Sequence, residues 1–375
     1  MLKKISICFI SQHAYPLFNK NCPATHGGSE VQMHLLGKKL KADGYEVSFI
    51  VGNFGQKSVE EYAGINVYKQ KLIYSKLMKI KGMWRVQQFQ LLSMLKKIKA
   101  DSYVINGATP DVFHQAYYSF ILNSKFVFMT ASDVDADGRY KKLFGEESGR
   151  YYEKGLQMAD LIICQNESQQ KTLEEKYHLQ SELIRNSIEI PAENPVVYEK
   201  KEILWVGSAQ PLKQPEIFLE LARKFPQHPF TMIMPKHNLE LWDKISQETV
   251  DIKNLRFIEK VPFEKIGEYY RKAKLFVNTS TYEGFPVTFL QSAIYGAPVL
   301  TLNVNPDDFL DKYDCGFCAD GNIDYLSQNI KELMENESLW KQKSENVFLY
   351  VKENHDIEKN AEIFKKYIHQ VVESS

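Results

Sequence analysis

The feature that most constrains the fold of this chain is an alternation of short apolar runs with helical patterns, which occurs in two successive series. Each run is β-rich and bounded by polar residues, so it predicts a buried strand. Alternation of such strands with helices predicts a parallel sheet with covering helices. The predicted strands of the first series lie at residues 5–11, 46–52, 65–70, 102–107, 125–131, 161–166 and 182–187.

The alternation stops at residues 188–202, where two prolines, an asparagine and several charged residues follow one another without apolar periodicity. Such a segment is typical of a linker between domains. A second series of predicted strands follows, at residues 202–208, 230–235, 255–261, 275–280 and 298–303.

The two series predict an α/β protein with two Rossmann-like domains whose parallel sheets face an interdomain cleft, the natural ligand site. The length of 375 residues suits two domains that each bury a core. We place the first domain at 1–190, the linker at 191–201 and the second domain at 202–355. A helical segment at 356–375 can reach back to the first domain.

Composition limits the partners and the compartment. The chain has 47 Lys and Arg residues against 47 Asp and Glu residues, so a nucleic acid is not the expected partner. Its 5 cysteines are an odd, sparse set that is compatible with a reducing compartment. No apolar run approaches the ~18 residues of a membrane span, and the N-terminus leads directly into a strand pattern. We therefore expect a cytoplasmic protein.

The pair Cys315 and Cys318 has the spacing of a zinc or redox motif. No second cysteine pair or paired histidine follows it. The sequence therefore predicts no metal site.

Two loops join the first predicted strand of each series to a helix. In THGGSE (25–30), Gly27 and Gly28 permit close backbone approach, and free amides at the helix start could hold a phosphate. The same glycines also suit any tight turn. In WVGSAQPLKQPE (205–216), Lys213 lies near a helix start and could meet a phosphate there. The alternative for Lys213 is an ordinary solvated surface lysine.

The most informative segment is NTSTYEGFPVTFLQSAIYGAPVL (278–300). After its strand, Glu283 begins a loop at the carboxyl ends of the strands, where open α/β sheets bind ligands. Pro286 suits the first position of a helix, and Gln291 follows about two turns along it. A carboxylate can accept hydrogen bonds from sugar hydroxyls, and free amides can hold phosphate or sugar oxygens. The alternative for Glu283 is a cap that satisfies the helix dipole.

These motifs together resemble the retaining glycosyltransferases of family 4, of the group 1 type with GT-B architecture. The matching features are GGSE with its helix, YEVSFIVG, WVGSAQPLKQPEIFLELA and EGFPVTFLQSAIYGAPVL, in the order and spacing of that family. The resemblance covers essentially the whole chain. It implies a nucleotide-sugar donor held mainly by the second domain, an acceptor held mainly by the first, and no required metal or other cofactor.

The resemblance also implies roles for individual residues. Gly27 and Gly28 would approach the donor diphosphate, Lys213 would neutralise it, and Glu283 would contact the transferred sugar. Pro286 itself has no N–H to offer. Further donor contacts would come from the backbone around Gly284, Phe285, Pro286 and Val287.

The chain departs from the family pattern at three positions. The usual Arg after the glycine of the WVG strand is Ser208, so one of two diphosphate cations is missing, with Arg185 or Lys236 as candidate replacements. The second Glu of the family is Gln291, whose amide can still bond ribose hydroxyls.

The third departure lies in the first domain, where the usual His-Asp pair is Ser132-Asp133. A histidine contact to donor or acceptor is therefore absent at this point. Asp133 and Asp135 are the predicted groups for orienting an acceptor hydroxyl, and we name Asp133 with Lys213 and Glu283 as the catalytic set.

Residues 69–99 combine nine Lys and Arg residues with many apolar residues and contain no Asp or Glu. One interpretation is a helix packed on the core with a solvated basic face. The other is a surface that docks on an anionic membrane.

The sequence thus predicts a metal-independent, retaining glycosyltransferase of the hexosyltransferase type. It would move a sugar from a UDP- or GDP-linked donor to a hydroxyl of a saccharide or lipid-linked saccharide, in surface polysaccharide or glycolipid synthesis. Positioning and charge stabilisation would supply the catalysis. Two alternatives stay open. One is a nucleotide-sugar epimerase of the same fold, and the other is a degenerate, inactive partner subunit, which Ser208 and Gln291 favour. The expected location is the cytoplasm, at the inner face of the membrane if residues 69–99 dock there.

Overall fold

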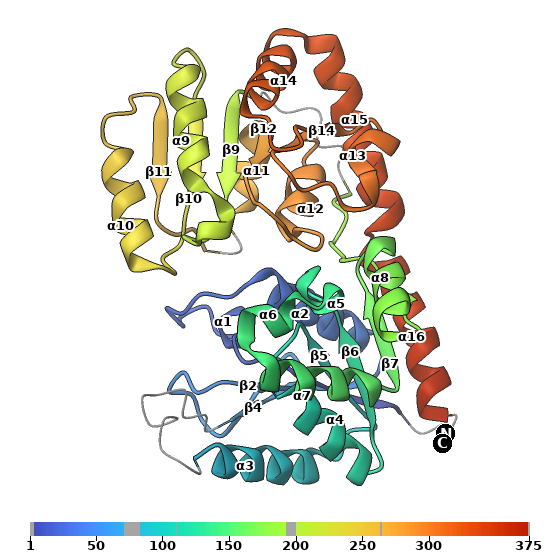
Figure 1. Cartoon of the computed structure of the whole chain (residues 1–375). Coiled ribbons are helices and arrows are strands. Elements are labelled where there is room, and N and C mark those ends of the chain that lie inside the picture. The colour runs from blue at the N-terminus through green and yellow to red at the C-terminus, as the bar shows by residue number, and fades with distance from the viewer. Residues whose placement is uncertain (1–3, 71–82, 110, 193–199, 263–264, 374–375) are drawn as a thin grey trace. The chain divides into compact units, whose positions relative to one another are not determined.

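In a computed structural model of the chain, residues 4–70, 83–109, 111–192, 200–262 and 265–373 are described. The chain forms two compact units (Figure 1). Unit 1 comprises Met1–Ser187 and Ile357–Ser375, and unit 2 comprises Ile188–Asp356. The first domain predicted from the sequence ends instead at residue 190, and part of the predicted linker, 193–199, lies outside the described residues.

Unit 1 is built on an eight-stranded sheet in the order β3-β4-β2-β1-β5-β6-β7-β8. Its strand pairs are parallel, except that β3 and β4 are antiparallel. All seven strands predicted for this part of the chain are present, so the α/β prediction is confirmed. The strands are β1 Ser6–Ile10, β2 Glu46–Val51, β3 Val59–Tyr62, β4 Ile65–Lys69, β5 Ser102–Asn106, β6 Lys125–Met129, β7 Leu161–Cys164 and β8 Glu182–Leu183.

Two details of this sheet differ from the sequence prediction. The edge strand β3 is not predicted, because its sequence VEEY has no buried apolar face. Ala63 and Gly64, with φ of 49° and 78°, form the tight turn that pairs it with β4. The predicted strand at 182–187 ends after Leu183, because its partner β7 ends at Cys164, the residue that pairs with Leu183. Further along, Gln32 bonds the backbone of Ser187 at both N–H (2.5 Å) and C=O (2.9 Å).

The last helix of the chain belongs to unit 1. Its buried residues Ile357, Ala361, Phe364 and Ile368 form one stripe at helical spacing and join the core of that unit. The helices of unit 1 are α1 Tyr15–Phe18, α2 Gly28–Ala42, α3 Met83–Ile98, α4 Val112–Ile121, α5 Val134–Asp137, α6 Arg139–Phe144, α7 Glu146–Gln157, α8 Glu167–Tyr177 and α16 Ile357–Glu373.

Unit 2 is built on a six-stranded parallel sheet in the order β11-β10-β9-β12-β13-β14. This is the 3-2-1-4-5-6 order of a doubly wound fold. The five strands predicted for this part are present, and the three-residue β14 is too short to show a pattern in the sequence. The strands are β9 Glu202–Val206, β10 Phe230–Ile233, β11 Leu255–Ile258, β12 Ala273–Asn278, β13 Val299–Thr301 and β14 Gly316–Cys318.

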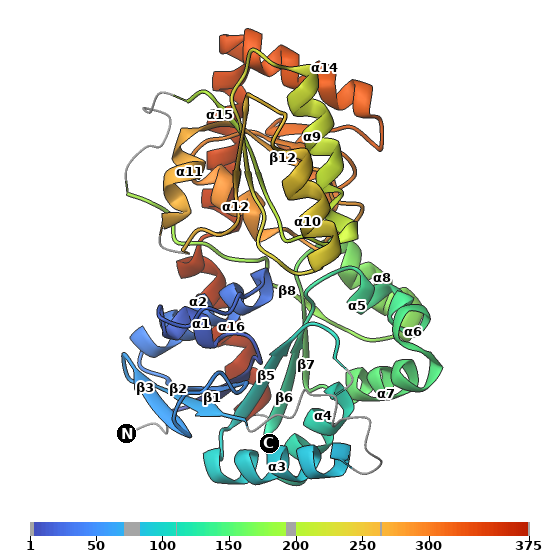
Figure 2. The same ribbon diagram turned by 90° about the vertical axis from the view of Figure 1, so that its left-hand side faces the viewer.

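Helices cover both faces of this sheet (Figure 2). Ile203 and Trp205 of β9 pack with α9, α10 and α14, whereas Leu204 between them packs with α11, α12, α13 and α15 on the other face. The helical segments are η3 Pro211–Lys213, α9 Pro215–Lys224, α10 Leu239–Glu248, α11 Gly267–Lys272, α12 Val287–Ala293, η5 Pro306–Asp308, α13 Phe309–Lys312, α14 Ile323–Glu335 and α15 Glu337–Asn354.

The strand order reverses between β9 and β12 in unit 2 and between β1 and β5 in unit 1. Ligands of open parallel sheets bind beyond the carboxyl ends of the strands at such a switch point.

Among the helices that the structure describes, none is both long enough and apolar enough to cross a membrane.

Candidate functional site

Lys213 lies in the loop that follows β9, at one side of the switch point of unit 2. It ends the short helix η3, and the next residue, Gln214, has a φ of 45° that turns the chain into α9. The loop is thus a sharp turn between two helical segments. The lysine is partly buried, with 21% of its side chain exposed.

Glu283 lies in the loop that follows β12, at the other side of the same switch point. Ser280 Oγ donates to Glu283 Oε1 at 2.8 Å, and the Ser280 backbone N–H donates to Asn278 Oδ1 at 3.1 Å. Only 17% of the Glu283 side chain is exposed. Pro286, the predicted first residue of the helix, is instead the N-cap of α12, so the helix begins one residue later at Val287.

The structure brings these two predicted residues together. Lys213 Nζ donates to Glu283 Oε1, which forms an ion pair between the loops after β9 and β12. A cation and a carboxylate thus share one partly buried position at the switch point. Lys213 is therefore not the solvated surface lysine of its alternative interpretation, and Glu283 is not the N-cap of α12, a position that Pro286 holds.

Further hydrogen bonds join the two loops. Thr281 N–H donates to Leu212 C=O at 2.9 Å, and Thr279 Oγ1 donates to Lys213 C=O at 2.6 Å. Trp205 Nε1 donates in turn to Thr279 Oγ1 at 2.9 Å. These supporting residues are absent from the predicted site, and their signal in the sequence is only that polar residues stand at a strand end.

Gln291 on α12 has a partner of its own. Tyr270 donates from its hydroxyl to Gln291 Oε1 at 3.0 Å, and burial raises the pKa of Tyr270 well above its usual value, so it stays a donor. Phe285 is buried against Phe309 and His355, so its side chain belongs to the core. The loop around Gly284, Phe285 and Val287 can therefore offer a ligand its backbone.

Ser208 follows β9 and accepts a hydrogen bond from Gln210 Nε2 at 2.7 Å. The candidate replacements for the missing cation both have acidic partners. Lys236 pairs with Glu259 at 3.1 Å. Arg185, in unit 1, pairs with Glu167 at 3.0 Å.

In the glycine loop of unit 1, the side chain of Glu30 caps the start of α2. Gly27 N–H donates to Glu30 Oε2 at 2.8 Å, and an added Cβ at Gly27 would meet that same oxygen at 2.8 Å. Gly27 and Gly28 are exposed at the start of α2. Any phosphate at this helix start would compete with Glu30 for the Gly27 amide.

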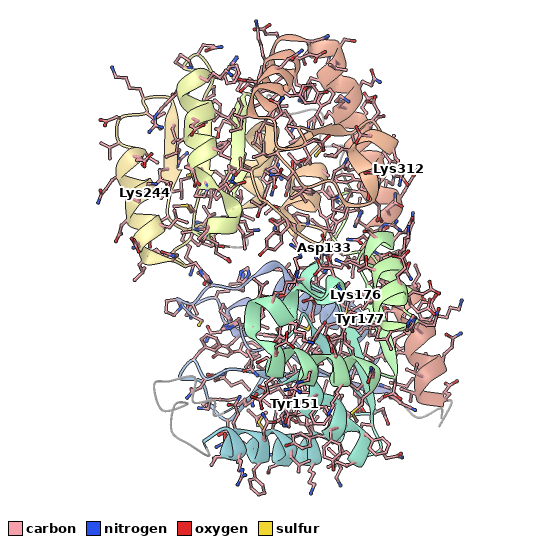
Figure 3. The ribbon with its side chains drawn as sticks, in the orientation of Figure 1. Asp133, Tyr151, Lys176, Tyr177, Lys244 and Lys312 are labelled. Carbon is pink, nitrogen blue, oxygen red and sulfur yellow. The ribbon has the colours of Figure 1, made fainter. Side chains whose placement is uncertain are left out.

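The acidic residues after β6 differ in environment. Asp133 stands just before α5 (Figure 3), and its Oδ1 accepts from Gln169 Nε2 at 3.0 Å. Burial raises the pKa of the Asp133 carboxyl. Asp135 is buried and accepts from the backbone N–H groups of Ala108 (3.1 Å), Ala131 (2.6 Å) and Ser132 (3.0 Å). Its carboxylate therefore holds the ends of β5 and β6, which leaves Asp133 as the more available acid.

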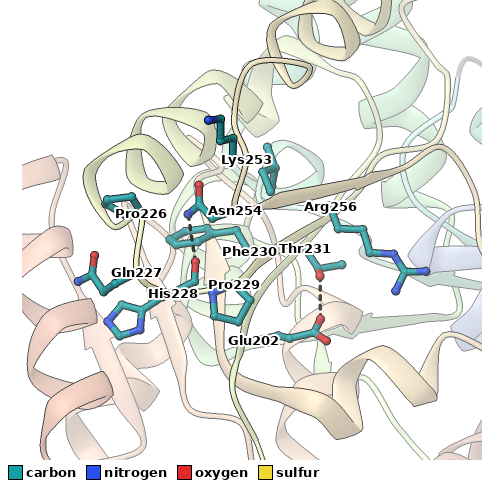
Figure 4. A pocket seen from close by; sticks show the side chains of 11 residues that line it. Glu202, Pro226, Gln227, His228, Pro229, Phe230, Thr231, Lys253, Asn254 and Arg256 are labelled. Atoms are coloured by element: carbon teal, nitrogen blue, oxygen red, sulfur yellow. Dashed lines mark hydrogen bonds between the residues drawn. The ribbon is translucent and has the colours of Figure 1, made fainter.

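A surface hollow of about 450 Å³ lies at the opposite edge of the sheet of unit 2 (Figure 4). It is lined by residues at the amino ends of β9, β10 and β11, including Glu202, Phe230 and Leu255. None of the predicted site residues lines it.

All five cysteines are free, so Cys315 and Cys318 form no disulfide. Within the described parts of the chain, no three His, Cys, Asp or Glu side chains gather as a metal site requires.

Comparison with known proteins gives two consecutive family matches. A model of "Glycosyltransferase Family 4" matches residues 26–190, and a model of "Glycosyl transferases group 1" matches residues 186–363. The chain belongs to the group 1, family 4 glycosyltransferases. Gly27, Gly28 and Asp133 of this glycosyltransferase fall in the first matched part, and Lys213 and Glu283 in the second.

Individual relatives agree with this family. An uncharacterized glycosyltransferase of Haemophilus influenzae is 24% identical over 353 residues, which cover 90% of this chain and 95% of the relative. The O-antigen chain mannosyltransferase B of Escherichia coli is 26% identical over 166 residues, 40% of this chain and 43% of that enzyme.

Solved structures agree with the predicted GT-B fold, which is confirmed. Sucrose-phosphate synthase from Thermosynechococcus elongatus has a TM-score of 0.80 at 16% identity, covering 99% of this chain and 100% of that one. A TarM mutant from S. aureus, in complex with fondaparinux, alpha-GlcNAc-glycerol and UDP, has a TM-score of 0.77 at 12% identity, covering 98% and 100%.

Proposed function

We propose that this glycosyltransferase moves a sugar from a UDP- or GDP-linked donor to an acceptor hydroxyl, with retention, in surface polysaccharide or glycolipid synthesis. The observation that carries the proposal is the pairing of Lys213 with Glu283 at the switch point of unit 2. The cation suits a diphosphate, and the carboxylate suits the hydroxyl donors of a sugar. The name of the E. coli relative, an O-antigen chain mannosyltransferase, supports the acceptor class.

The proposed reaction is a direct displacement on one face of the sugar. The acceptor oxygen bonds to the anomeric carbon as the bond from that carbon to the diphosphate oxygen breaks, and the acceptor proton passes to the departing diphosphate. Lys213 stabilises the charge that develops on the leaving group, while Glu283 orients the sugar. Asp133 stays the predicted contact for the acceptor hydroxyl.

Nucleotide release from UDP- and GDP-sugars in the presence of candidate acceptors tests this proposal, with the anomeric configuration of the product read by NMR. Lys213→Ala should lower kcat/KM by roughly 10²-fold or more, since the charge on the leaving group loses its counter-ion. Glu283→Ala should lower transfer strongly without a large change in thermal unfolding. The matched control is Lys224→Ala, because Lys224 pairs with Asp324 on the exposed surface of the same unit. Retention of most activity by Lys213→Ala would remove Lys213 from the site.

We also propose that transfer needs no divalent metal. Lys213 supplies positive charge at the position where the diphosphate would lie, which is the work that a metal does in other transferases. Turnover should therefore persist in EDTA. Loss of activity in EDTA and its return with Mg²⁺ or Mn²⁺ would contradict this.

A second candidate function is that of an inactive partner subunit. It is favoured by Ser208 and Gln291, which stand where the family usually has Arg and Glu. A folded preparation that binds no nucleotide sugar, or binds it without turnover on any acceptor, would support this candidate.

The proposal includes docking of unit 1 on an anionic membrane. Four cations of the predicted segment, Lys71, Lys76, Lys79 and Lys81, lie outside the described residues. The solvent side of α3 carries Arg85, Lys96 and Lys97 together with Val86 and Phe89, and Phe89 is 73% exposed.

The neighbouring helix α4 supports this docking (Figures 1 and 2). It touches α3 through the bond from Gln88 Nε2 to Asp111 Oδ1 at 2.7 Å. It carries no charged residue, and it exposes Tyr117, Phe120 and Ile121. Exposed apolar side chains beside a basic helix face suit an anionic interface.

A further inference from the structure

The ion pair of Lys213 and Glu283 bears on product release as well as on donor binding. In the structure each side chain is the charged partner of the other. An arriving diphosphate therefore meets a lysine that is already neutralised. We propose that Glu283 is an internal competitor for Lys213, which lets the site discriminate the intact donor from the nucleoside diphosphate product. This inference rests on the proposed function.

The exchange of partners can be local, because the loops are held independently of the ion pair. The bonds from Thr281 N–H to Leu212 C=O and from Thr279 Oγ1 to Lys213 C=O involve neither charged group. Trp205 fixes Thr279 from the buried side. Separating the two charges therefore needs a side-chain movement of Lys213 or Glu283, and the backbone can stay in place.

An intact donor can satisfy both members of the separated pair. Its diphosphate replaces Glu283 as the partner of Lys213, and the hydroxyls of its sugar donate to the carboxylate. The Ser280 hydroxyl keeps its bond to Glu283 Oε1 in either state, since it lies on the Glu283 side of the pair.

A nucleoside diphosphate satisfies only one of them. It brings the anion for Lys213 but lacks the transferred sugar, whose hydroxyls would donate to Glu283. The carboxylate, with 17% of its side chain exposed, would then lose its cation and face an added negative charge. Return of Glu283 to Lys213 thus favours departure of the diphosphate once the sugar has left.

The test is the affinity of Glu283→Gln for UDP and for GDP, measured by isothermal titration calorimetry against wild type. Glutamine keeps the length of the side chain and removes the charge that competes for Lys213. The variant should bind the nucleoside diphosphate that matches its donor roughly tenfold tighter than wild type does, the scale of a lost charge pair near a ligand. Its affinity for the intact nucleotide sugar should rise less or fall, so the ratio of the two affinities shifts toward the product.

Glu248→Gln is the matched control. It makes the same change of charge in unit 2, where Glu248 pairs with Arg223 at 3.5 Å between α9 and α10. It should leave both affinities unchanged. Glu283→Ala gives a second variant without the carboxylate, and thermal unfolding checks that each variant is folded.

The outcomes separate this inference from the proposed function. Equal or weaker diphosphate binding by both Glu283 variants, in a protein whose wild type binds nucleotide, would overturn the inference alone. Wild type that binds neither UDP, GDP nor their sugars would overturn the proposed function and the inference with it.

Discussion

Lys213 and Glu283 are 70 positions apart in the chain, and each is marked by its own local pattern. Each follows a strand and precedes a helix, which places it at the carboxyl edge of a parallel sheet. Their contact depends on the pairing of β9 with β12, two strands that are not consecutive in the sequence. The position of each charged residue at the binding edge of the sheet can be predicted from its local sequence. Which residue it pairs with depends on the order of the strands in the sheet.

Ser208 gives a prediction at the same scale. Because it lies in the loop after β9 and has no charge, Ser208→Arg should add a cation where the family has one and tighten UDP or GDP binding, by about tenfold for one charge-assisted contact. The dissociation constant measured by calorimetry checks this. An unchanged constant would mean that another cation, such as Lys236, already contacts the diphosphate.

Asp135 predicts a pH dependence of stability. Burial raises the pKa of its carboxyl from the ordinary 3.8 to about 6, so the folded state holds the proton more tightly. Its contribution to the free energy of unfolding is therefore complete below pH 4 and falls as the pH rises toward 6. Asp135→Asn does not titrate and leaves the Ala108 N–H without an acceptor, at a cost of about 1–3 kcal/mol.

Urea unfolding of wild type and Asp135→Asn between pH 4.5 and 7.5 measures this effect. The stability advantage of wild type should be largest at the acid end and shrink as the pH rises. A difference that stays constant across this range would show that Asp135 does not titrate within it.

At the scale of elements, α3 and α4 lead to a prediction on membrane binding. Replacing both Phe89 and Phe120 with Ser should reduce sedimentation of the protein with anionic vesicles, because each residue is 73% exposed and available to enter the interface. Neutralising Lys76, Lys79, Lys81 and Arg85 together should reduce it too. Salt should weaken binding by wild type, since screening shortens to about 3 Å at 1 M.

The control for the apolar change is Leu239→Ser on α10 of unit 2, where the side chain is 62% exposed. It should leave sedimentation unchanged, and nucleotide binding should survive in all these variants. Failure of wild type to bind anionic vesicles at low salt would point to a soluble acceptor and leave α3 as a helix with a solvated basic face.

For the whole molecule, α16 joins the two ends of the chain in one unit. Ile357, Ala361, Phe364 and Ile368 are all buried in the core of unit 1, where burial of a large apolar side chain contributes about 1.5–3 kcal/mol. Lys39 pairs with Glu358 at 2.7 Å, and Lys365 pairs with Asp43 at 2.8 Å. Truncation after residue 356 should therefore destabilise unit 1 far more than unit 2.

Hydrogen exchange and limited proteolysis of the truncated chain check this, with Ile368→Ala as a milder variant that should cost about 2–5 kcal/mol. Protection should fall in the strands of unit 1, while β9 to β14, whose cores contain no residue of α16, should stay protected. Intact protection of β1 and β2 without α16 would contradict the prediction.

Much of the fold could be predicted because buried parallel strands are continuous apolar runs. Ile7, Cys8 and Phe9 of β1 and Phe276 of β12 are fully buried, and the sequence marks both strands. β3 and β14 were missed, since an exposed polar strand and a three-residue strand carry no such pattern. The early end of β8 depends on its neighbour β7, whose last residue, Cys164, pairs with Leu183.

The sequence by itself determined the α/β class, the two series of strands and the family, because apolar periodicity and loop motifs are local properties of the chain. It also marked Lys213 and Glu283, whose binding roles stay predictions. Only the tertiary structure decided that these two side chains are partners and that Trp205, Thr279 and Ser280 support them. It also decided that the Asp135 carboxylate accepts hydrogen bonds from three backbone N–H groups. The physical reason is that hydrogen bonds and ion pairs depend on distances between loops, and strand pairing sets those distances across long separations in sequence.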